Sequence, residues 1–414
     1  MPTLAQKYEN NKQDINVLTE SDVQLGAPTY SSSAPPIAQS TIAKRSELSK
    51  LISVFAPALG RLTLKTGDPY ALDNQIDKAA LYWTPYKGNN IALYDGTRWR
   101  LRKFSETIFY LTRVGSCTTT NGSNVITVNY TPPPGDEFTS RELIVGMLVS
   151  GTGIPASTTI SSISGNQVTL NNNATADGTV SLTFKVPGSK LYDVVGFDVE
   201  LGIVSGGYGI LALTLVPWTN STTRANALST QNGVPCLTDA VNISGVSVAG
   251  SRLRYLGTIA MQADGTTYDS YSYRYIWNMY NRLRRIGFTY NTNASWTYGT
   301  GAWRECNGGT GQVRFNFIVG EPTELCATLN DWFSTPAGGG YGGFYIDGTT
   351  SADLSMLSYS GQLAYGFNTS RRVKLCSVGY HYATQVEWCN ATGTHYGNGA
   401  ATSNAYHSMF TLEM

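Results

Sequence analysis

Hydrophobic and polar residues alternate over short distances along most of this chain. Alternation is clear in residues 61–64, and it recurs at residues 90–94 and 99–101, on the two sides of the pair Asp95–Gly96. Two alternating runs joined by Asp-Gly predict a β-hairpin. Further short strands are predicted at residues 197–201, 210–215, 313–318, 343–346 and 373–375. The pattern predicts an all-β protein of several small domains that resemble β-sandwiches or jelly rolls.

One segment departs from this pattern and predicts a short α-helix. In residues 40–55 apolar side chains recur at helical spacing, while charged side chains occupy the opposite face. Pro57 and Gly60 predict its end, so we assign residues 40–60 to this helix and its exit. The apolar face either packs on the helix's own domain or docks on a partner, for example as a collar on a trimer axis. Its residues are Ile42, Leu48, Leu51, Ile52 and Phe55.

Changes in composition divide the rest of the chain. Residues 1–39 are polar, lack periodicity and end in a Ser- and Pro-rich run, which predicts an extended arm that becomes ordered on a partner. Residues 114–185 are rich in Thr, Ser, Asn, Gly and Val, and predict a small β-module. Because a strand pattern like that of the earlier residues resumes at Leu191, we expect this module to be inserted into a host β-sandwich formed by residues 61–113 and 186–285. Residues 286–414 are expected to form a jelly-roll-like C-terminal knob.

Charge and hydropathy exclude several classes of protein. Lys plus Arg is 29 and Asp plus Glu is 28, and this balance argues against a nucleic-acid binder. Hydrophobic residues make up 41% of the chain, as expected for a folded protein. No apolar run approaches the roughly 20 residues of a membrane span, and the N-terminus lacks the apolar core of a signal peptide. None of the six Cys forms a C-x-x-C pair, so we expect mostly buried thiols, with disulfides as the alternative.

Aromatic residues supply the candidate binding chemistry. The chain has 26 Tyr and 8 Trp, and rings of this kind offer apolar faces with polar edges. In the C-terminal region we expect weak glycan or receptor contacts, with a core or subunit-interface role as the alternative. In residues 268–285 aromatic and Arg residues interleave; either they stack bases or they form strands whose rings the Arg side chains cover, and the near-zero net charge favours the second. The glycine-rich residues 338–343 are predicted to form a loop. The candidate contacts are Tyr341, Tyr380, Tyr382, Trp388 and Tyr396.

Catalytic and metal-binding patterns give little support for an enzyme. The chain has three His, all between residues 381 and 414, and it lacks a G-x-S-x-G elbow, H-x-x-x-H spacing and a phosphate-binding loop. We therefore predict no catalytic residues, no metal site and no cofactor. Asp193, Asp198 and Glu200 cluster in sequence and could act as paired carboxylates in glycan cleavage. The alternative is that Asp198 and Glu200 are the solvated face of one strand.

Four stretches resemble phage virion proteins. Residues 81–96, LYWTPYKGNNIALYDG, resemble the YTPY-x-G-x-x-IALYDG stretch of a widespread group of tailed-phage virion proteins. Residues 254–259, RYLGTI, and 275–282, YIWNMYNR, are similar to the RYLGTI and FVWNYYNR stretches of that group. WTNSTTR at 218–224 fits between the first stretch and these two. Residues 145–155, VGMLVSGTGIP, resemble a small β-module of phage fibre and adhesin-like proteins.

The resemblance implies a virion component assembled in the cytoplasm of a bacterial host. We expect a homotrimeric fibre, spike or head appendage, without enzymatic activity. Its N-terminal arm would attach to capsid, portal, tail or baseplate proteins, and its C-terminal knob would contact host-surface glycan. Nucleic acid and membrane insertion are not expected. The alternatives are a capsid decoration or head-fibre protein without a receptor role, and a polysaccharide depolymerase.

Overall fold

The computed structural model describes residues 56–129, 143–198, 211–290, 293, 295–308, 314–334, 339–348, 350, 352–359, 366–396 and 407–414. Within these ranges the regular elements are β-strands, apart from 3₁₀ turns at Gly250–Arg252 and Cys306–Gly308. The predicted all-β class is therefore confirmed. The expected arm at residues 1–39 lies outside the described residues. So does the expected helix, with its face of Ile42, Leu48, Leu51, Ile52 and Phe55.

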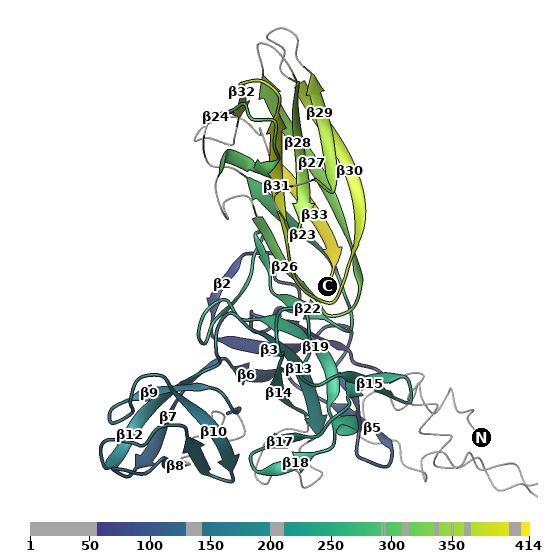
Figure 1. The fold of residues 1–414 in the computed structure, drawn as a ribbon. Coiled ribbons are helices and arrows are strands. Elements are labelled where there is room, and N and C mark those ends of the chain that lie inside the picture. The colour runs from purple at the N-terminus through teal and green to yellow at the C-terminus, as the bar shows by residue number, and fades with distance from the viewer. Residues whose placement is uncertain are drawn as a thin grey trace, which may run out of the picture.

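Two sheets form the centre of the molecule (Figure 1). One contains three strands in the order β1 (Gly60–Thr63), β3 (Ala80–Pro85) and β6 (Thr107–Tyr110). Leu81 and Trp83 of this sheet belong to the same buried core as Val194 and Leu256 of the second sheet. The hairpin predicted around Asp95–Gly96 is confirmed, because β4 (Asn90–Tyr94) pairs with β5 (Trp99–Lys103). The second sheet runs β14 (Leu211–Pro217), β13 (Leu191–Asp198), β19 (Arg254–Ala260), β16 (Val234–Leu237) and β15 (Leu228–Gln231), with β22 (Ile276–Asn278) paired to β19.

A small closed barrel, which we call the side barrel, lies beside these central sheets (Figure 1). Its alternating strands bury an apolar interior that includes Ile126, Val149 and Phe184. The first and last strands pair along their whole length, from Thr112 opposite Lys185 to Thr119 opposite Gly178. The barrel covers the residues for which the sequence suggested an inserted module. Its strands are β7 (Thr112–Thr119), β8 (Val125–Val128), β9 (Leu148–Gly151), β10 (Thr158–Ser164), β11 (Gln167–Leu170) and β12 (Gly178–Lys185), and a separate hairpin of β17 (Val241–Ile243) and β18 (Val246–Val248) lies nearby.

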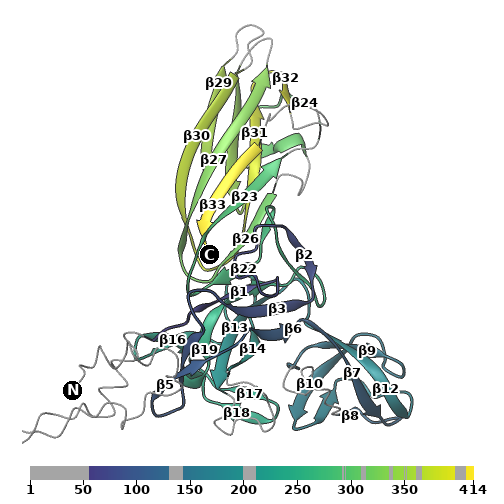
Figure 2. The same cartoon turned by 180° about the vertical axis from the view of Figure 1, so that it is seen from behind.

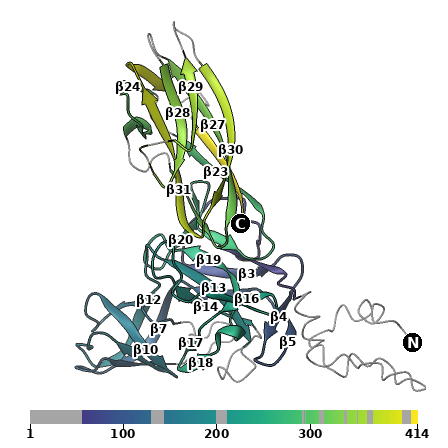
Figure 3. The ribbon, with the colours of Figure 1, turned by 45° about the vertical axis from the view of Figure 1, so that its right-hand side comes forward.

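A second body, the C-terminal sandwich, stands on the central sheets (Figures 1 and 3). Its two sheets enclose an aromatic core, in which the Phe315 ring stacks on Phe317 at 5.2 Å and on Phe410 at 5.1 Å between centroids. The first sheet runs β2 (Gln75–Lys78), β20 (Thr267–Asp269), β21 (Tyr273–Arg274), β26 (Arg314–Val319), β31 (Gly379–Cys389), β28 (Gly339–Ile346) and β29 (Leu354–Tyr359), with β25 (Arg304–Glu305) on β31. The second runs β23 (Arg284–Tyr290), β33 (His407–Glu413), β27 (Thr323–Ser334), β32 (Gly393–Tyr396) and β24 (Ser295–Tyr298), with β30 (Gly366–Cys376) on β27.

The glycine-rich segment at 338–343 was wrongly expected to be a loop. From Gly339 onward it is strand β28, which pairs with β29 on one side and with β31 on the other. Glycine has a low strand propensity, but two ladders of backbone hydrogen bonds hold this strand in an extended conformation. Local composition was therefore overridden by pairing with segments distant in sequence.

Three segments that are distant in sequence meet around one buried arginine. Arg254, on β19, is 1% exposed. Its guanidinium donates hydrogen bonds to the main-chain oxygens of Ala56 and Pro57 at 3.0 Å and of Ala92 at 2.6 Å. It also donates to the Tyr280 hydroxyl at 3.1 Å. Three separate segments are thus tied to one side chain.

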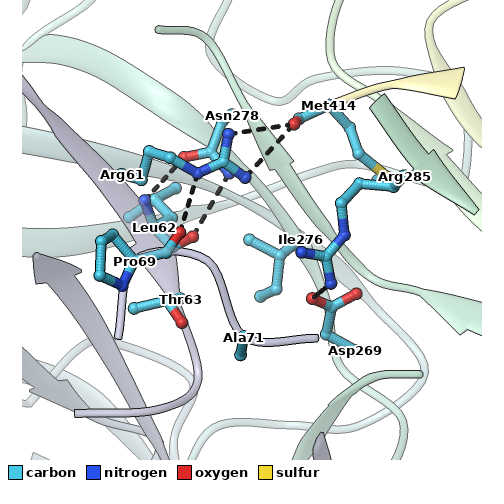
Figure 4. A pocket seen from close by; sticks show the side chains of 10 residues that line it. All are labelled: Arg61, Leu62, Thr63, Pro69, Ala71, Asp269, Ile276, Asn278, Arg285 and Met414. Carbon is cyan, nitrogen blue, oxygen red and sulfur yellow. Dashed lines mark hydrogen bonds and ion pairs between the residues drawn. The ribbon is translucent and has the colours of Figure 1, made fainter. Parts of the chain in front are cut away.

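A second cluster of polar groups joins the central sheets to the C-terminal sandwich (Figure 4). Arg61 donates to the main-chain oxygens of Pro69 at 3.1 Å and Met414 at 3.4 Å. Close by, Arg285 donates to Asp269 at 2.8 Å. Burial and the neighbouring Arg285 lower the pKa of Arg61 to about 10. We call these three side chains and two main-chain oxygens the Arg61 cluster; it connects β1 to Met414, the residue after β33.

The motif glycine Gly257 is required by a close backbone approach. A Cβ at this position would lie 2.2 Å from the Trp277 main-chain oxygen. On the next strand, the Asn278 side-chain oxygen accepts a hydrogen bond from the Leu62 amide at 2.6 Å. The RYLGTI and YIWNMYNR stretches therefore fit together through backbone contact as well as through side chains.

Candidate functional site

The aromatic residues singled out from the sequence separate into two groups. Tyr341 and Trp388 are paired across β28 and β31, and their rings meet edge to face at 5.2 Å between centroids. Trp303 joins them at 6.1 Å from Tyr341, and all three are partly exposed. Eight residues back along β31 lies Tyr380, about 27 Å away at the usual rise per residue of a strand. The two groups cannot contact one small ligand together.

The other two candidate contacts lie on β31 and β32. Tyr382 is partly exposed on β31, and Arg314 lies over its ring at 4.5 Å. Tyr396 is the last residue of β32, where it pairs with Ser295; its side chain lies outside the described residues. Of the five predicted contacts, Tyr380 alone lines the cavity described next.

A cavity of about 440 Å³ opens between the central sheets and the C-terminal sandwich. This size lies within the range of about 300–1,000 Å³ that is typical of small-ligand pockets. The walls come from the start of β13, the end of β19, strands β21, β26 and β31, and the loop after β14. The lining residues are Ser189, Lys190, Leu191, Ser221, Ala260, Met261, Gln262, Tyr273, Tyr275, Arg314, Asn316 and Tyr380. We call this space the joint cleft.

Hydrogen bonds fix the aromatic wall of the joint cleft. The Tyr380 hydroxyl donates to the Asn316 side-chain oxygen at 2.6 Å. The Tyr275 ring lies 6.2 Å from the Tyr380 ring between centroids, and Tyr273 meets the Tyr275 ring edge to face at 5.4 Å. Burial raises the pKa of both Tyr275 and Tyr380, so their hydroxyls stay protonated at neutral pH. The three rings therefore form one packed wall, which the bond from Tyr380 to Asn316 holds in place.

The charges at the joint cleft are nearly balanced. Arg314 makes a two-pronged ion pair with Glu305, at 2.9 and 3.1 Å. The hydrogen bond to Glu305 raises the pKa of Arg314 further, so the guanidinium remains charged and engaged. Lys190 is exposed at the rim. A ligand in this cleft would meet one exposed positive charge, three tyrosines and several amide or hydroxyl groups.

A buried cluster on the inner face of β31 contains a cysteine, a histidine and a carboxylate. Cys389 Sγ lies 3.4 Å and Glu387 Oε2 3.5 Å from the same nitrogen, His395 Nε2. A nucleophilic triad needs the nucleophile and the carboxylate on different ring nitrogens. All three residues are 0% exposed. Burial lowers the pKa of His395 to about 3, so the ring is neutral, and the arrangement is that of a packed core.

Glu387 is held by the groups that surround it. Trp296 Nε1 and Arg304 Nε each donate to its carboxylate at 2.6 Å, and the Asn307 amide donates at 3.1 Å. Burial raises the pKa of Glu387 against the effect of these hydrogen bonds. The carboxylate joins β24, β25 and β31 inside the sandwich and is 0% exposed.

The carboxylates considered for glycan cleavage are also inside the protein. Asp193 is 1% exposed and accepts from Arg224 at 2.7 Å, and Asp198 is 2% exposed and accepts from Arg102 at 2.8 Å. The interpretation of Asp198 as part of a solvated strand face is therefore wrong: the strand lies in the middle of a sheet and is covered on both faces. Glu200 lies outside the described residues. A glycosidase pair must face its substrate, and these two Asp do not.

The cysteine thiols are mostly inside the protein. All six Cys are thiols, and all except Cys326 are buried, as the sequence suggested. Burial raises the pKa of Cys117 and Cys376 to about 12, which keeps both thiols unreactive. In the described part of the chain, no three His, Cys, Asp or Glu side chains are grouped so that they could hold a metal ion. No helix among those residues is long and apolar enough to cross a membrane.

Comparisons with known proteins give no family. No family model and no curated protein matches the chain. Among solved structures, the VP2 subviral particle of infectious bursal disease virus is 10% identical with a TM-score of 0.22, over 73% of this chain and 71% of that one. The Cry4Aa toxin of Bacillus thuringiensis is 8% identical with a TM-score of 0.20, over 73% and 52% of the two chains. Scores this low carry no argument about function.

The joint cleft was only partly visible in the sequence. Tyr380 was chosen for its place in an aromatic, turn-rich region, and Tyr273 and Tyr275 belong to the aromatic run at 268–285. In that run the interpretation of Arg side chains covering rings is confirmed, since Arg282 lies over Trp277 at 5.1 Å. Lys190, Gln262 and Asn316 carried no sequence signal. Tertiary contacts alone bring them together.

Proposed function

We propose that this chain is a structural subunit of a bacteriophage virion, an oligomeric fibre- or spike-type appendage without enzymatic activity. In this proposal residues 1–39 attach it to other virion proteins, and residues 286–414 point outward toward the host surface. The stretches shared with phage virion proteins motivate the proposal, and the supporting observation is how those stretches are used. Arg254 and Tyr280 come from two of them and form one hydrogen-bonded joint with Ala92 from a third, in which Arg254 and Ala92 are buried.

A role of these motif residues in holding the fold together suits a structural component. The motif side chains bind main-chain oxygens of their own protein, so they define how its parts are held. A fibre or spike must transmit force between its attachment and its tip. A joint built on buried, satisfied hydrogen bonds resists that force better than exposed contacts do.

A homotrimer, which the resemblance implies, is supported by exposed apolar side chains on one sheet face, which lie next to the charged residues Arg284, Glu324 and Glu413 of the same strands. The second sheet of the C-terminal sandwich presents strands β23, β33, β27 and β30 side by side (Figure 2). Ile286, Thr411, Cys326 and Val373 form one transverse row across these four strands. Ile286 is 40% exposed, Val373 48% and Leu375 65%. We propose that a second copy of this chain covers this outer sheet face.

Purified particles test the location. Antibody labelling of intact virions from the phage that encodes this chain should place the protein on the particle, at the tail for a fibre or at the head for a decoration protein. Deletion of residues 1–39 should leave a folded oligomer that no longer enters particles. A full complement of the truncated protein in particles would contradict attachment through the arm.

Light scattering after size exclusion tests the oligomer. The wild-type chain should elute as a trimer, and Val373→Lys with Leu375→Lys should shift it to a monomer. Leu72→Lys is the matched control, because Leu72 is also 65% exposed but lies outside the outer sheet face. A wild-type monomer at micromolar concentration would refute the trimer. Release of new reducing ends from host polysaccharide would instead favour the depolymerase alternative.

A further inference from the structure

We propose that the joint cleft is a saccharide-binding site. The inference rests on the proposed function, because it assigns the ligand to the host surface. The proposed site is separate from the Tyr341–Trp388 group, which lies at the other end of strand β31. The contacts would come from Tyr273, Tyr380, Asn316, Gln262 and Lys190, all of which line the cleft.

The chemistry of the lining matches a sugar ring. A pyranose presents apolar C–H faces and a rim of hydroxyl groups, so it needs both flat rings and hydrogen-bonding groups. Tyr273 and Tyr380 are partly exposed rings on one wall. Asn316 and Gln262 carry amides that can donate and accept at the same time, which suits hydroxyl groups. The bond from Tyr380 to Asn316 fixes that amide before any ligand arrives.

Other ligand classes fit the lining less well. A purely apolar ligand would remove water from the Asn316 and Gln262 amides without replacing the hydrogen bonds that water makes, at a considerable cost. A nucleic acid would need several cations along its backbone. Here Arg314 is already neutralised by Glu305, which leaves Lys190 as the exposed cation among the lining residues.

The position of the joint cleft gives binding a structural consequence. Lys190 and Gln262 belong to the central sheets, whereas Asn316 and Tyr380 belong to the C-terminal sandwich. The Ser221 main-chain oxygen already accepts a hydrogen bond from the Tyr380 amide at 2.8 Å and closes one end of the space. A saccharide in the cleft would contact both bodies and stiffen their connection.

The test uses the full-length protein and surface polysaccharide purified from the host bacterium. Affinity is measured by titration for the wild type and for two cleft variants. Tyr380→Phe removes one hydroxyl and should weaken binding about tenfold, as expected for one lost hydrogen bond to a polar partner. Ser221→Trp fills the cleft from its exposed edge and should abolish binding.

Tyr70→Phe is the matched control, since it makes the same chemical change at an exposed tyrosine outside the joint cleft and should leave the affinity unchanged. Thermal unfolding of each variant reports whether the fold is intact. Equal affinity of Ser221→Trp and the wild type would overturn the inference. So would a wild-type protein that is found on particles but does not bind the polysaccharide, and that outcome would leave the proposed function standing. Saccharide binding by a protein absent from particles would reject the proposed function and leave the cleft site intact.

Discussion

Two arginines of this protein each lie over a tyrosine at the same distance, yet their surroundings differ. Arg254 is 4.5 Å from the Tyr280 ring centre, and Arg314 is 4.5 Å from that of Tyr382. Arg254 is 1% exposed and donates to neutral main-chain oxygens. The Arg314 side chain is 28% exposed and is paired with the carboxylate of Glu305. One pair holds the base of the molecule together, and the other borders a cleft.

The comparison shows that burial, more than residue type, decides what an Arg–Tyr pair does. A buried guanidinium loses its hydration and is stable only when its donors are satisfied, so its partners become fixed parts of the fold. A partly exposed ion pair contributes little to stability, because water competes for both groups. Such a pair leaves its ring and neighbouring amides available for a ligand.

The largest expected effect comes from Arg254→Met. The substitution leaves the main-chain oxygens of Ala56, Pro57 and Ala92 without their buried donor. We expect the free energy of unfolding to fall by about 4 kcal/mol. Chemical denaturation followed by tryptophan fluorescence measures it. A loss below about 1 kcal/mol would mean that the joint does not depend on this side chain.

Gly257→Ala is expected to have the next largest effect. The new methyl group would meet the Trp277 main-chain oxygen at 2.2 Å, and backbone cannot move aside as a flexible side chain can. We expect a loss of about 3 kcal/mol in the same measurement, as for other overpacked sites. Gly301→Ala is the control, because its methyl group would lie 3.7 Å from the Trp388 ring in ordinary contact. Equal stability of the two variants would contradict the close packing of β19 on β22.

A smaller effect should depend on pH and involves His381, a buried residue with a half-exposed partner. Its ring nitrogens bond to the Asp347 carboxylate at 2.7 Å and to the Ser377 carbonyl at 2.8 Å. Burial and nearby Lys374 lower its pKa, but these hydrogen bonds outweigh them and raise it above the usual 6.5. The charged form is therefore favoured in the folded state.

The sign of the effect follows from linkage. The stabilisation is fully present below pH 6.5 and is lost as pH rises through the elevated pKa of the folded state. Denaturation midpoints should fall from pH 6 to pH 9 in the wild type, and the fall should be smaller in His381→Phe. If the denaturation midpoints of the two proteins changed in parallel with pH, the charged His381 ring would not contribute to stability.

The smallest expected effect on stability is that of Arg314→Met. Because its ion pair with Glu305 is partly exposed, the loss should stay below about 1 kcal/mol. The difference between the losses in free energy of unfolding of Arg314→Met and Arg254→Met measures directly how far the two arginines differ in their contribution to stability. A loss as large as that of Arg254→Met would remove the distinction.

Local patterns in the sequence predicted the strands but not their neighbours. Alternation located the hairpin at Asp95–Gly96, because its pairing is local. Strand β21 pairs in parallel with β26, which lies some 40 residues further on, and no local signal specifies such a partner. As a result, the first sheet of the C-terminal sandwich takes in β2, β20 and β21, from before residue 286.

The candidate site, like the strand pairing, could be predicted only where it depends on local sequence. Aromatic density pointed to Tyr380 and equally to Tyr341 and Trp388, which lie in another group on the same strand. The joint cleft needs Lys190, Gln262 and Asn316 as well, and each is an ordinary polar residue in its own segment. A cavity between two bodies is a property of how they pack, so single-segment patterns cannot reveal it.

The side barrel enters and leaves the central sheets at one place, where the Val186 amide donates to the Leu111 oxygen at 2.9 Å and Thr112 pairs with Lys185. Because the two ends of the barrel segment already touch, a short turn could rejoin the chain if that segment were removed. The contacts that would be lost include the bond from the Gly165 amide to the Ser244 oxygen. The side barrel is thus a separable unit of the fold, whereas the joint around Arg254 is made by three segments that cannot be separated from one another.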